Sequence, residues 1–201
     1  MAVAIRDVNQ RDLDAVLALN NGAGPGILPL NREALRWFHD HASYFRVAEV
    51  DRHLAGFLIA LREGTDYRSP NYRWFASRYE RFVYIDRIVV ASSQRGAGLG
   101  RVFYSDVQSY AEVRVPVLAC EVFLEPRNDA VLLFHGTFGF QEVGQHPTTP
   151  EQPPVSLLRK PLPAFEFVAG QYLRDGGQLP DLPWLRERTQ AASTDRATGT
   201  A

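Results

Sequence analysis

The spacing of apolar residues changes several times along the chain, so short apolar runs typical of strands alternate with the three-to-four spacing typical of helices. The central stretch is 83–90, whose β-branched and aromatic residues predict a buried strand. From Gly100 the spacing predicts a helix, with an apolar face formed by Val102, Phe103, Val107 and Tyr110. A strand, a short turn and a helix therefore form the centre of the predicted fold.

The rest of the chain follows the same alternation of strands and helices. The other predicted strands are 3–8, 44–50, 53–61, 117–123, 141–145 and 154–159. The other predicted helices are 12–19, 32–40, 130–136 and 165–173. Segments 20–30 and 63–81 are predicted to be irregular; within the first, 20–26 is rich enough in glycine for a mobile loop, and the second is expected to be ordered by its aromatic residues. Mixed in this order, the elements predict an α/β fold.

Composition indicates one globular domain, or one domain followed by a tail. Of the 201 residues 45% are hydrophobic, and the net charge of -1 gives no reason to expect binding to nucleic acid or to an anionic membrane. Cys120 is the only cysteine, which excludes an intrachain disulfide and a cysteine-rich zinc site. Because neither a membrane-length apolar run nor the apolar region of a signal peptide is found, we expect a cytoplasmic protein.

The turn after the central strand is rich in glycine and reads Arg95-Gly96-Ala97-Gly98-Leu99-Gly100. Glycines let the backbone approach a ligand closely, and the free N–H groups at a helix start attract an anion such as a pyrophosphate. The spacing differs from the dinucleotide signature G-x-G-x-x-G, and the lysine of the phosphate loop G-x-x-x-x-G-K-[ST] is absent. The turn therefore predicts a different kind of phosphate contact.

Extended by a few residues, this turn resembles the acetyl-CoA pyrophosphate loop of the GNAT acetyltransferases (Gcn5-related N-acetyltransferases). The extended pattern is Val89-Val90-x-x-x-x-Arg95-Gly96-x-Gly98-Leu99-Gly100-Arg101. A second match follows in Asn128 and in Phe134-His135-x-x-Phe138-Gly139-Phe140. The resemblance implies a GNAT-like mixed, centrally splayed sheet of six to seven strands flanked by about four helices. It assigns residues 1–160 to that domain and leaves 161–201 as a C-terminal extension.

The resemblance also implies acetyl-CoA as co-substrate and no metal. By position, the main-chain N–H of Ile88 would stabilise the oxyanion, and the main chain of Val90 would bind the pantetheine arm. The residues implied to bind the cofactor are Ile88, Val89, Val90, Arg95, Gly96, Ala97, Gly98, Leu99, Gly100, Arg101, Asn128 and His135.

His135 stands where many members of the family place a tyrosine that protonates the departing CoA thiolate. An imidazole titrates near neutrality and could donate the same proton or hydrogen bond. A histidine that only packs on its own helix is the alternative, and both interpretations stay open.

Three carboxylates could take the proton of the attacking amine. Strand alternation places Tyr84, Asp86, Ile88 and Val90 on one face, and this makes Asp86 the first choice. Glu121 on the neighbouring strand is the second choice and Glu125 the third. For Asp86 and Glu121 the alternative is an ion pair with a nearby arginine.

Substrate specificity is expected in the two irregular segments. Tyr67, Tyr72 and Trp74 could wall the amine pocket, or instead cover the sheet or form a dimer contact. The resemblance implies an acetyl-CoA-dependent N-acetyltransferase for a primary amine of a small molecule or amino acid. A peptide or protein acetyltransferase and a catalytically weak acyl-CoA-binding module are the alternatives.

The extension carries apolar residues that could pack on the domain or on a second copy in a homodimer. These residues are Phe165, Phe167, Tyr172, Leu179, Leu182 and Trp184. Segment 180–184 is expected to dock, and 191–201 is expected to be loose.

Overall fold

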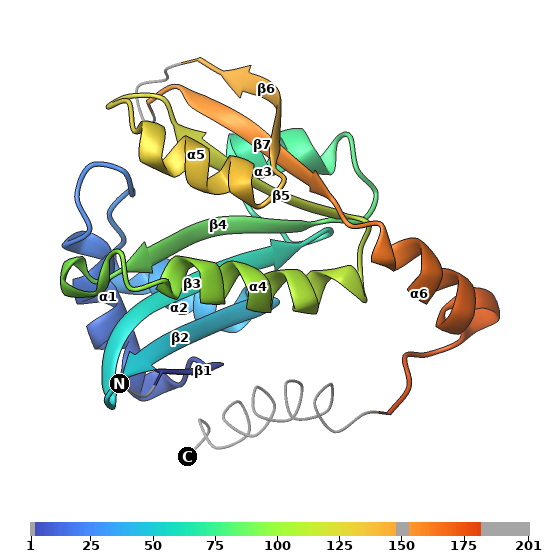
Figure 1. The fold of residues 1–201 in the computed structure, drawn as a ribbon, viewed down its shortest axis with the longest axis horizontal. Helices are drawn as coiled ribbons and strands as arrows, with labels where there is room; N and C mark the ends of the chain where they lie inside the picture. Colours follow the sequence, from blue (N-terminus) through green and yellow to red (C-terminus); the bar gives the residue numbers. More distant parts are fainter. Residues whose placement is uncertain (1–2, 148–152, 182–201) are drawn as a thin grey trace.

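The computed structural model describes residues 3–147 and 153–181, and these form a mixed α/β structure around one seven-stranded sheet. The strand order is β1-β2-β3-β4-β5-β7-β6 (Figure 1). The strands are β1 Val3–Asp7, β2 Tyr44–Val50, β3 His53–Arg62, β4 Val83–Val90, β5 Val117–Phe123, β6 Gln141–His146 and β7 Val155–Pro161. All predicted strands are therefore found: three have the predicted ends, and the ends of the others differ by at most two residues.

The described residues include six α-helices. They are α1 Leu13–Asn21, α2 Arg32–His41, α3 Pro70–Ala76, α4 Leu99–Glu112, α5 Asp129–Thr137 and α6 Ala164–Tyr172. Five of them lie against the sheet, while α6 extends from its end (Figure 1). The caps explain several starts: the Asn31 side chain accepts a hydrogen bond from the Ala34 N–H at α2, and Asn128 accepts one from Val131 at α5. On α4, Phe103 and Val107 are buried as predicted, but Val102 is 41% exposed because it lies beside that face.

Helix α3 was not predicted, since segment 63–81 was expected to be irregular. Its start has two local signals: Ser69 accepts a hydrogen bond from the Tyr72 N–H, and Pro70 occupies the first turn. The helix is only seven residues long, and burial of Tyr72 and Phe75 against the sheet stabilises it. Such a short helix is held by tertiary packing more than by its own propensity.

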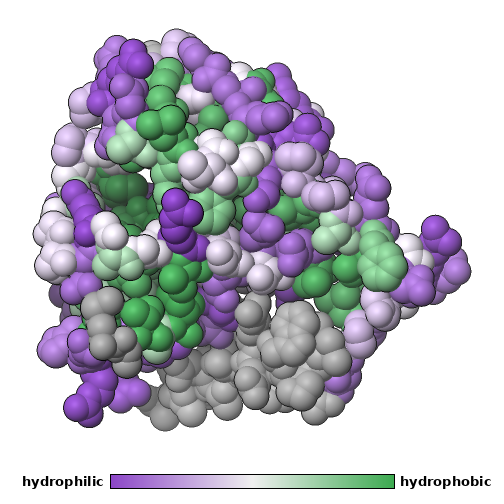
Figure 2. Space-filling model, in the orientation of Figure 1, coloured by the Kyte–Doolittle hydropathy of each residue, from purple (hydrophilic) through white to green (hydrophobic). Residues whose placement is uncertain are grey.

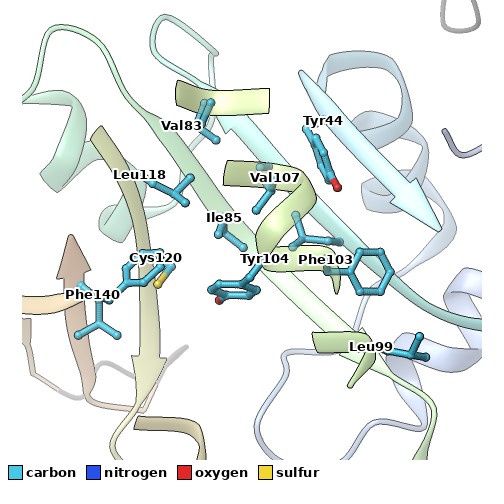
Figure 3. Close-up of a cluster of buried hydrophobic side chains, with 14 of the residues drawn as sticks. Tyr44, Val83, Ile85, Leu99, Phe103, Tyr104, Val107, Leu118, Cys120 and Phe140 are labelled. Atoms are coloured by element: carbon cyan, nitrogen blue, oxygen red, sulfur yellow. The ribbon is translucent and has the colours of Figure 1, made fainter. Parts of the chain in front are cut away.

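The sheet separates two hydrophobic cores. One core contains residues of α4, such as Phe103, Tyr104 and Val107, and packs against α5 (Figure 3). The other core lies under α1, α2 and α3, with Val16, Phe38 and Phe75 among its buried residues. In Figure 1, α4 and α5 accordingly lie in front of the sheet, while α1 and α2 lie behind it.

Strands β4 and β5 are the one parallel pair in the described sheet, and they soon separate. Only Val83, Tyr84 and Ile85 pair with β5, opposite Leu118, Ala119 and Cys120. Beyond this point β4 continues to Val90, paired only with β3 among the described strands. The splayed sheet that the resemblance implied is thus present.

A β-bulge interrupts β4 at Asp86. Ile59 of β3 lies opposite Arg87 and the next residue, Ala60, lies opposite Ile85, so Asp86 has no partner on β3. An extra residue shifts every later side chain to the other face. The prediction that Tyr84 shares a face with Ile88 and Val90 is therefore wrong: Tyr84 lies in the core beneath α3, and the other two pack toward α4.

The C-terminal extension begins as part of the domain. The Leu162 N–H donates to the Pro116 carbonyl, and Phe165 of α6 is 7% exposed beneath the Arg81 guanidinium. Phe167 and Tyr172 on the same helix are exposed. The predictions for Leu182, Trp184 and 191–201 fall outside the described residues. None of the described helices is both long and apolar enough to cross a membrane.

Helix α6 offers a matched pair of substitutions. We expect Phe165→Ala to lower the free energy of unfolding by about 3 kcal/mol, because it removes a buried ring from the junction with the domain. Phe167→Ala, at a position 69% exposed, should change it by less than about 0.5 kcal/mol. Urea-induced unfolding of both variants is the measurement. Equal effects would contradict the docking of α6 through Phe165.

Candidate active site

A cavity of about 730 Å³ lies where β4 and β5 separate. Its lining comes from the segment between α1 and α2, from β4 and β5, from the glycine-rich turn, and from α4 and α5. Figure 2 shows the surface hollowed between α5 and the α1–α2 segment, with apolar residues in the hollow. The cavity reaches groups of both cores, since Tyr104 belongs to one and Tyr67 packs on the other.

The glycine-rich turn forms one side of this cavity. Gly96 and Gly98 have φ angles of 81° and 87°, which side chains with a Cβ rarely adopt. Gly98 is the N-cap of α4, so it has no side chain to occupy the first N–H groups of that helix. Gly100 is small for another reason: a Cβ there would lie 3.2 Å from the ring of Phe134 on α5.

The structure brings nearly all residues implied for the cofactor to the cavity. Those that line it are Ile88, Val89, Val90, Arg95, Gly96, Gly98, Leu99, Gly100, Arg101, Asn128 and His135. Ala97 does not line it and is exposed on the outside of the turn.

The main chain of β4 directs polar groups into the gap. The Ala91 N–H donates to the Ala55 carbonyl of β3, and N–H groups alternate sides along a strand. The N–H groups of Ile88 and Val90 therefore point to the opposite edge, where β5 has already separated. Both residues are half-buried and line the cavity.

Glu121 brings a carboxyl group to the cavity from β5. The Tyr84 hydroxyl donates a hydrogen bond to this carboxyl, and so does the Asn71 side chain of α3. Burial, together with the negative charge of Asp86, raises the pKa of Glu121 from 4.5 to about 8, although Tyr84, Asn71 and Arg87 partly offset these effects. Glu121 can therefore exchange a proton near neutral pH.

Asp86 is held by two partners. Its Oδ2 accepts a hydrogen bond of 2.6 Å from the Tyr67 hydroxyl, and its Oδ1 accepts one of 2.7 Å from Arg87 Nε. The Asp86 side chain is only 4% exposed. The ion pair considered as the alternative for Asp86 is thus present, and its partner is the next residue in the chain.

Arg87 also fixes the segment between α1 and α2. Its Nη1 donates to Asn20 Oδ1 at 2.9 Å and to the Leu28 carbonyl at 3.1 Å. The side chain of Asn21 donates to the Leu30 carbonyl and accepts from the Leu30 N–H. Side chains thus anchor the part of the segment that follows the glycine-rich stretch, a role for Arg87 and Asn20 that the sequence did not reveal.

Of the three aromatic residues expected to wall the acceptor pocket, only Tyr67 lines the cavity. Tyr72 is buried and its hydroxyl donates to the Arg62 carbonyl. Trp74 packs against Gly144 of β6 and under the Arg78 guanidinium. Helix α3 turns both side chains away from the cavity, so this part of the prediction is corrected. Glu125 is exposed in the turn after β5 and does not line the cavity.

His135 lines the cavity from α5 but is only 5% exposed. Its Nδ1 lies 2.8 Å from the Val131 carbonyl oxygen and its Nε2 lies 2.6 Å from the hydroxyl of Tyr104 on α4. Burial lowers the pKa of His135, and the hydrogen bond to Val131 only partly opposes this. Tyr104, which with Tyr110 is the nearest alternative in the sequence for supplying the proton if His135 is structural, also lines the cavity.

Comparison with known proteins fits this geometry. The model of the acetyltransferase (GNAT) family matches residues 15–140. The chain therefore belongs to the GNAT acetyltransferase family, whose members transfer an acetyl group to an acceptor. A comparison with curated protein sequences gave no match.

Solved structures share the fold at low sequence identity. The ribosomal-protein-S18-alanine N-acetyltransferase of Escherichia coli is 18% identical with a TM-score of 0.60, covering 80% of this chain and 94% of its own. Naa50 of Arabidopsis thaliana, solved with the bisubstrate analogue CoA-Ac-MVNAL, is 17% identical with a TM-score of 0.61, covering 80% and 99%. The yncA protein of Salmonella typhimurium, solved with its cofactor acetyl-CoA, is 19% identical with a TM-score of 0.61, covering 90% and 99%.

The raised pKa of Glu121 predicts how stability depends on pH. The folded chain keeps the Glu121 proton up to about pH 8, whereas an unfolded chain loses it near 4.5. Between these values the folded state binds more protons, so a rise in pH favours unfolding. We expect the free energy of unfolding of the wild type to fall as the pH rises from 4.5 to 8, and we expect Glu121→Gln to lack this fall.

The measurement is denaturant unfolding of wild type and variant across that range. Glu125→Gln, the same change at an exposed carboxyl, serves as control. If both variants have the same pH dependence as the wild type, Glu121 does not keep its proton in the folded state.

Proposed function

We propose that the protein is an acetyl-CoA-dependent N-acetyltransferase that acts on a primary amine of a small molecule or amino acid. The observation that carries the proposal is the cavity through the gap between β4 and β5. One side of it is formed by an anion-attracting helix start, and the other by a carboxyl group with a pKa near 8. An acyl transfer needs both, in one connected space.

Acetyl-CoA, when bound, supplies the activated thioester, and the chain positions it. The free N–H groups at the start of α4 would accept the pyrophosphate, because glycine lets the backbone approach it and the helix dipole favours negative charge. The Val90 N–H, directed into the gap, would bind the amides of the pantetheine arm. The exposed guanidinium groups of Arg95 and Arg101 beside the turn add positive charge for the phosphates.

The Ile88 N–H is proposed as the donor to the oxyanion. It points into the same gap as the Val90 N–H, two residues nearer the point where β4 and β5 still pair. A preorganised main-chain donor in a site shielded from water stabilises developing negative charge without having to reorient.

Glu121 is proposed as the base that takes the proton of the amine. A base works best with a pKa near the operating pH, and the pKa of Glu121 is about 8. Asp86, the first choice on sequence grounds, has both oxygens engaged by Tyr67 and Arg87. We assign it to positioning: it holds Arg87, which in turn anchors the α1–α2 segment.

The walls at the acceptor end support a small substrate. Ile27 and Leu28 line the cavity from the anchored α1–α2 segment, and Tyr67 and Phe123 line it from other elements. A fixed, largely apolar wall suits a compact amine better than an extended peptide. The neighbours that act on ribosomal protein S18 or carry a peptide analogue make the peptide substrate the alternative to be tested.

Cofactor binding is tested at Gly98. We expect Gly98→Asp to abolish binding of CoA, because it places a carboxylate where the pyrophosphate should meet the N–H groups. Gly64→Asp is the matched control, since Gly64 also has a positive φ, 79°, and is exposed outside the cavity. Isothermal calorimetry with CoA is the measurement. Unchanged affinity in a folded Gly98→Asp protein would show that the turn is no cofactor site.

Catalysis is tested at Glu121 with a panel of amines, amino acids and short peptides. We expect kcat/KM of the wild type to rise with pH to a midpoint near 8, where Glu121 loses its proton. Glu121→Gln should lower kcat about 10²- to 10⁴-fold, the usual contribution of a general base. Glu125→Gln should leave it unchanged.

The panel also separates the alternatives. Acetylation of peptides but not of small amines would replace the proposed substrate class. CoA binding without any acetyl transfer to the panel would leave a binding module.

A further inference from the structure

Tyr104 and His135 form a buried polar pair on the cofactor side of the cavity. Tyr104 comes from α4 and His135 from α5, and the Tyr104 hydroxyl oxygen lies 2.6 Å from His135 Nε2. Both residues line the cavity, although Tyr104 is 1% and His135 is 5% exposed. Figure 3 shows the Tyr104 side chain reaching from α4 toward Cys120 on β5.

The hydrogen bonds determine where the protons of this pair lie. The Val131 carbonyl can only accept, so the His135 nitrogen 2.8 Å from it, Nδ1, carries a hydrogen. Burial keeps the imidazole neutral by lowering its pKa, so Nε2 has no hydrogen and accepts the one from the Tyr104 hydroxyl. His135 consequently has no N–H left to offer to a ligand in the cavity.

The remaining surroundings of the Tyr104 hydroxyl are mostly apolar. The rings of Phe134, Phe138 and Phe140 lie around the tyrosine ring. The titratable groups that face the hydroxyl are His135 of α5 and, from β5, Cys120 in hydrogen-bonding contact and Glu121 at longer range. In such surroundings a hydrogen bond to an anion is strong, because little water competes for it.

We propose that the Tyr104 hydroxyl, and not His135, donates the hydrogen bond that stabilises the sulfur of CoA as it leaves. This inference rests on the proposed function, in which the thioester lies in this cavity. His135 is the positioning residue. Before the reaction its Nε2 accepts the hydrogen bond of the Tyr104 hydroxyl, and this contact fixes the ring of Tyr104 against α5.

The step balances without proton transfer from Tyr104. The amine nitrogen forms its bond to the acetyl carbon, and Glu121 takes the amine proton. As the carbon–sulfur bond breaks, its electron pair goes to the sulfur, and the Tyr104 hydroxyl turns from His135 to this sulfur. The products are the amide, protonated Glu121 and the CoA thiolate held by the hydrogen bond. Because burial raises the pKa of Tyr104 well above its ordinary value, the hydroxyl donates a hydrogen bond and keeps its proton.

The first test measures the thiol of bound CoA directly. A donor to the thiolate lowers the pH at which bound CoA ionises, so Tyr104→Phe should raise this pH by about one unit or more. Ultraviolet absorbance of the thiolate follows the titration, with the complex of desulfo-CoA as blank. Tyr110→Phe, the same change on the same helix but outside the cavity, is the control and should leave the titration unchanged.

The second test uses acetyl transfer. Tyr104→Phe should lower kcat about ten- to a hundredfold while the Kd of desulfo-CoA stays within about twofold. His135→Leu should lower kcat less, and His135→Gln, whose side-chain oxygen can accept from Tyr104, should restore much of the loss. If His135 acts only through Tyr104, adding His135→Leu to Tyr104→Phe costs little more.

The results separate this inference from the proposed function. A wild type that acetylates amines, together with a Tyr104→Phe variant of full rate and unchanged thiol titration, overturns the role of Tyr104 alone. A wild type that binds no CoA overturns the proposed function and this inference with it. Tyr104→Phe could fail to bind desulfo-CoA. In that case the thiol titration of bound CoA is compared between His135→Gln and His135→Leu, and equal titrations overturn the inference.

Discussion

The early end of pairing between β4 and β5 is the constraint on which the candidate site depends. A parallel pair normally satisfies the main-chain groups along both strands, yet here only three residues of β4 pair with β5. The N–H groups of Ile88 and Val90 are thereby left facing open space inside a sheet whose other described strands are joined. Helices α4 and α5 pack on one face of the sheet and α1 to α3 pack on the other, and this hydrophobic packing fixes the positions of the strands on both sides of the gap.

The gap also places different chemistry on its two sides. Toward α1 and α3 lie the carboxyl groups, with Glu121 between Tyr84 and Asn71 and Asp86 between Tyr67 and Arg87. Toward α4 and α5 lie the glycine-rich turn and the neutral pair of Tyr104 and His135. An acceptor entering on the first side meets a group that can take a proton. On the second side, the free N–H groups of the turn, the Tyr104 hydroxyl and the guanidinium groups of Arg95 and Arg101 would face a bound acyl donor, so the two sides differ in charge.

Much of the fold could be predicted from the sequence, because strand runs, helix spacing and the glycine-rich turn are local signals. The list of residues around the turn could also be predicted, since they follow one another in the chain. The bulge at Asp86 could not, because it depends on a mismatch with β3. The pairing of Tyr104 with His135 could not be predicted either, because these residues lie on two different helices and are 31 positions apart in the sequence. Contacts of this kind depend on how helices and strands pack against one another, and a local sequence pattern carries no information about that packing.

The anchoring of the α1–α2 segment has a consequence for how such a protein can diverge. Arg87, Asn20 and Asn21 bind the main chain at Leu28 and Leu30 and make no use of the side chains between positions 23 and 27. Pro25 lines the cavity and is exposed, so a substitution there would alter the wall while the anchors stay in place; Ile27 also lines the cavity but packs on the core beneath α1 to α3 as well. The anchors act on the main chain, so the exposed part of this segment can change in sequence without loss of the hydrogen bonds that hold it.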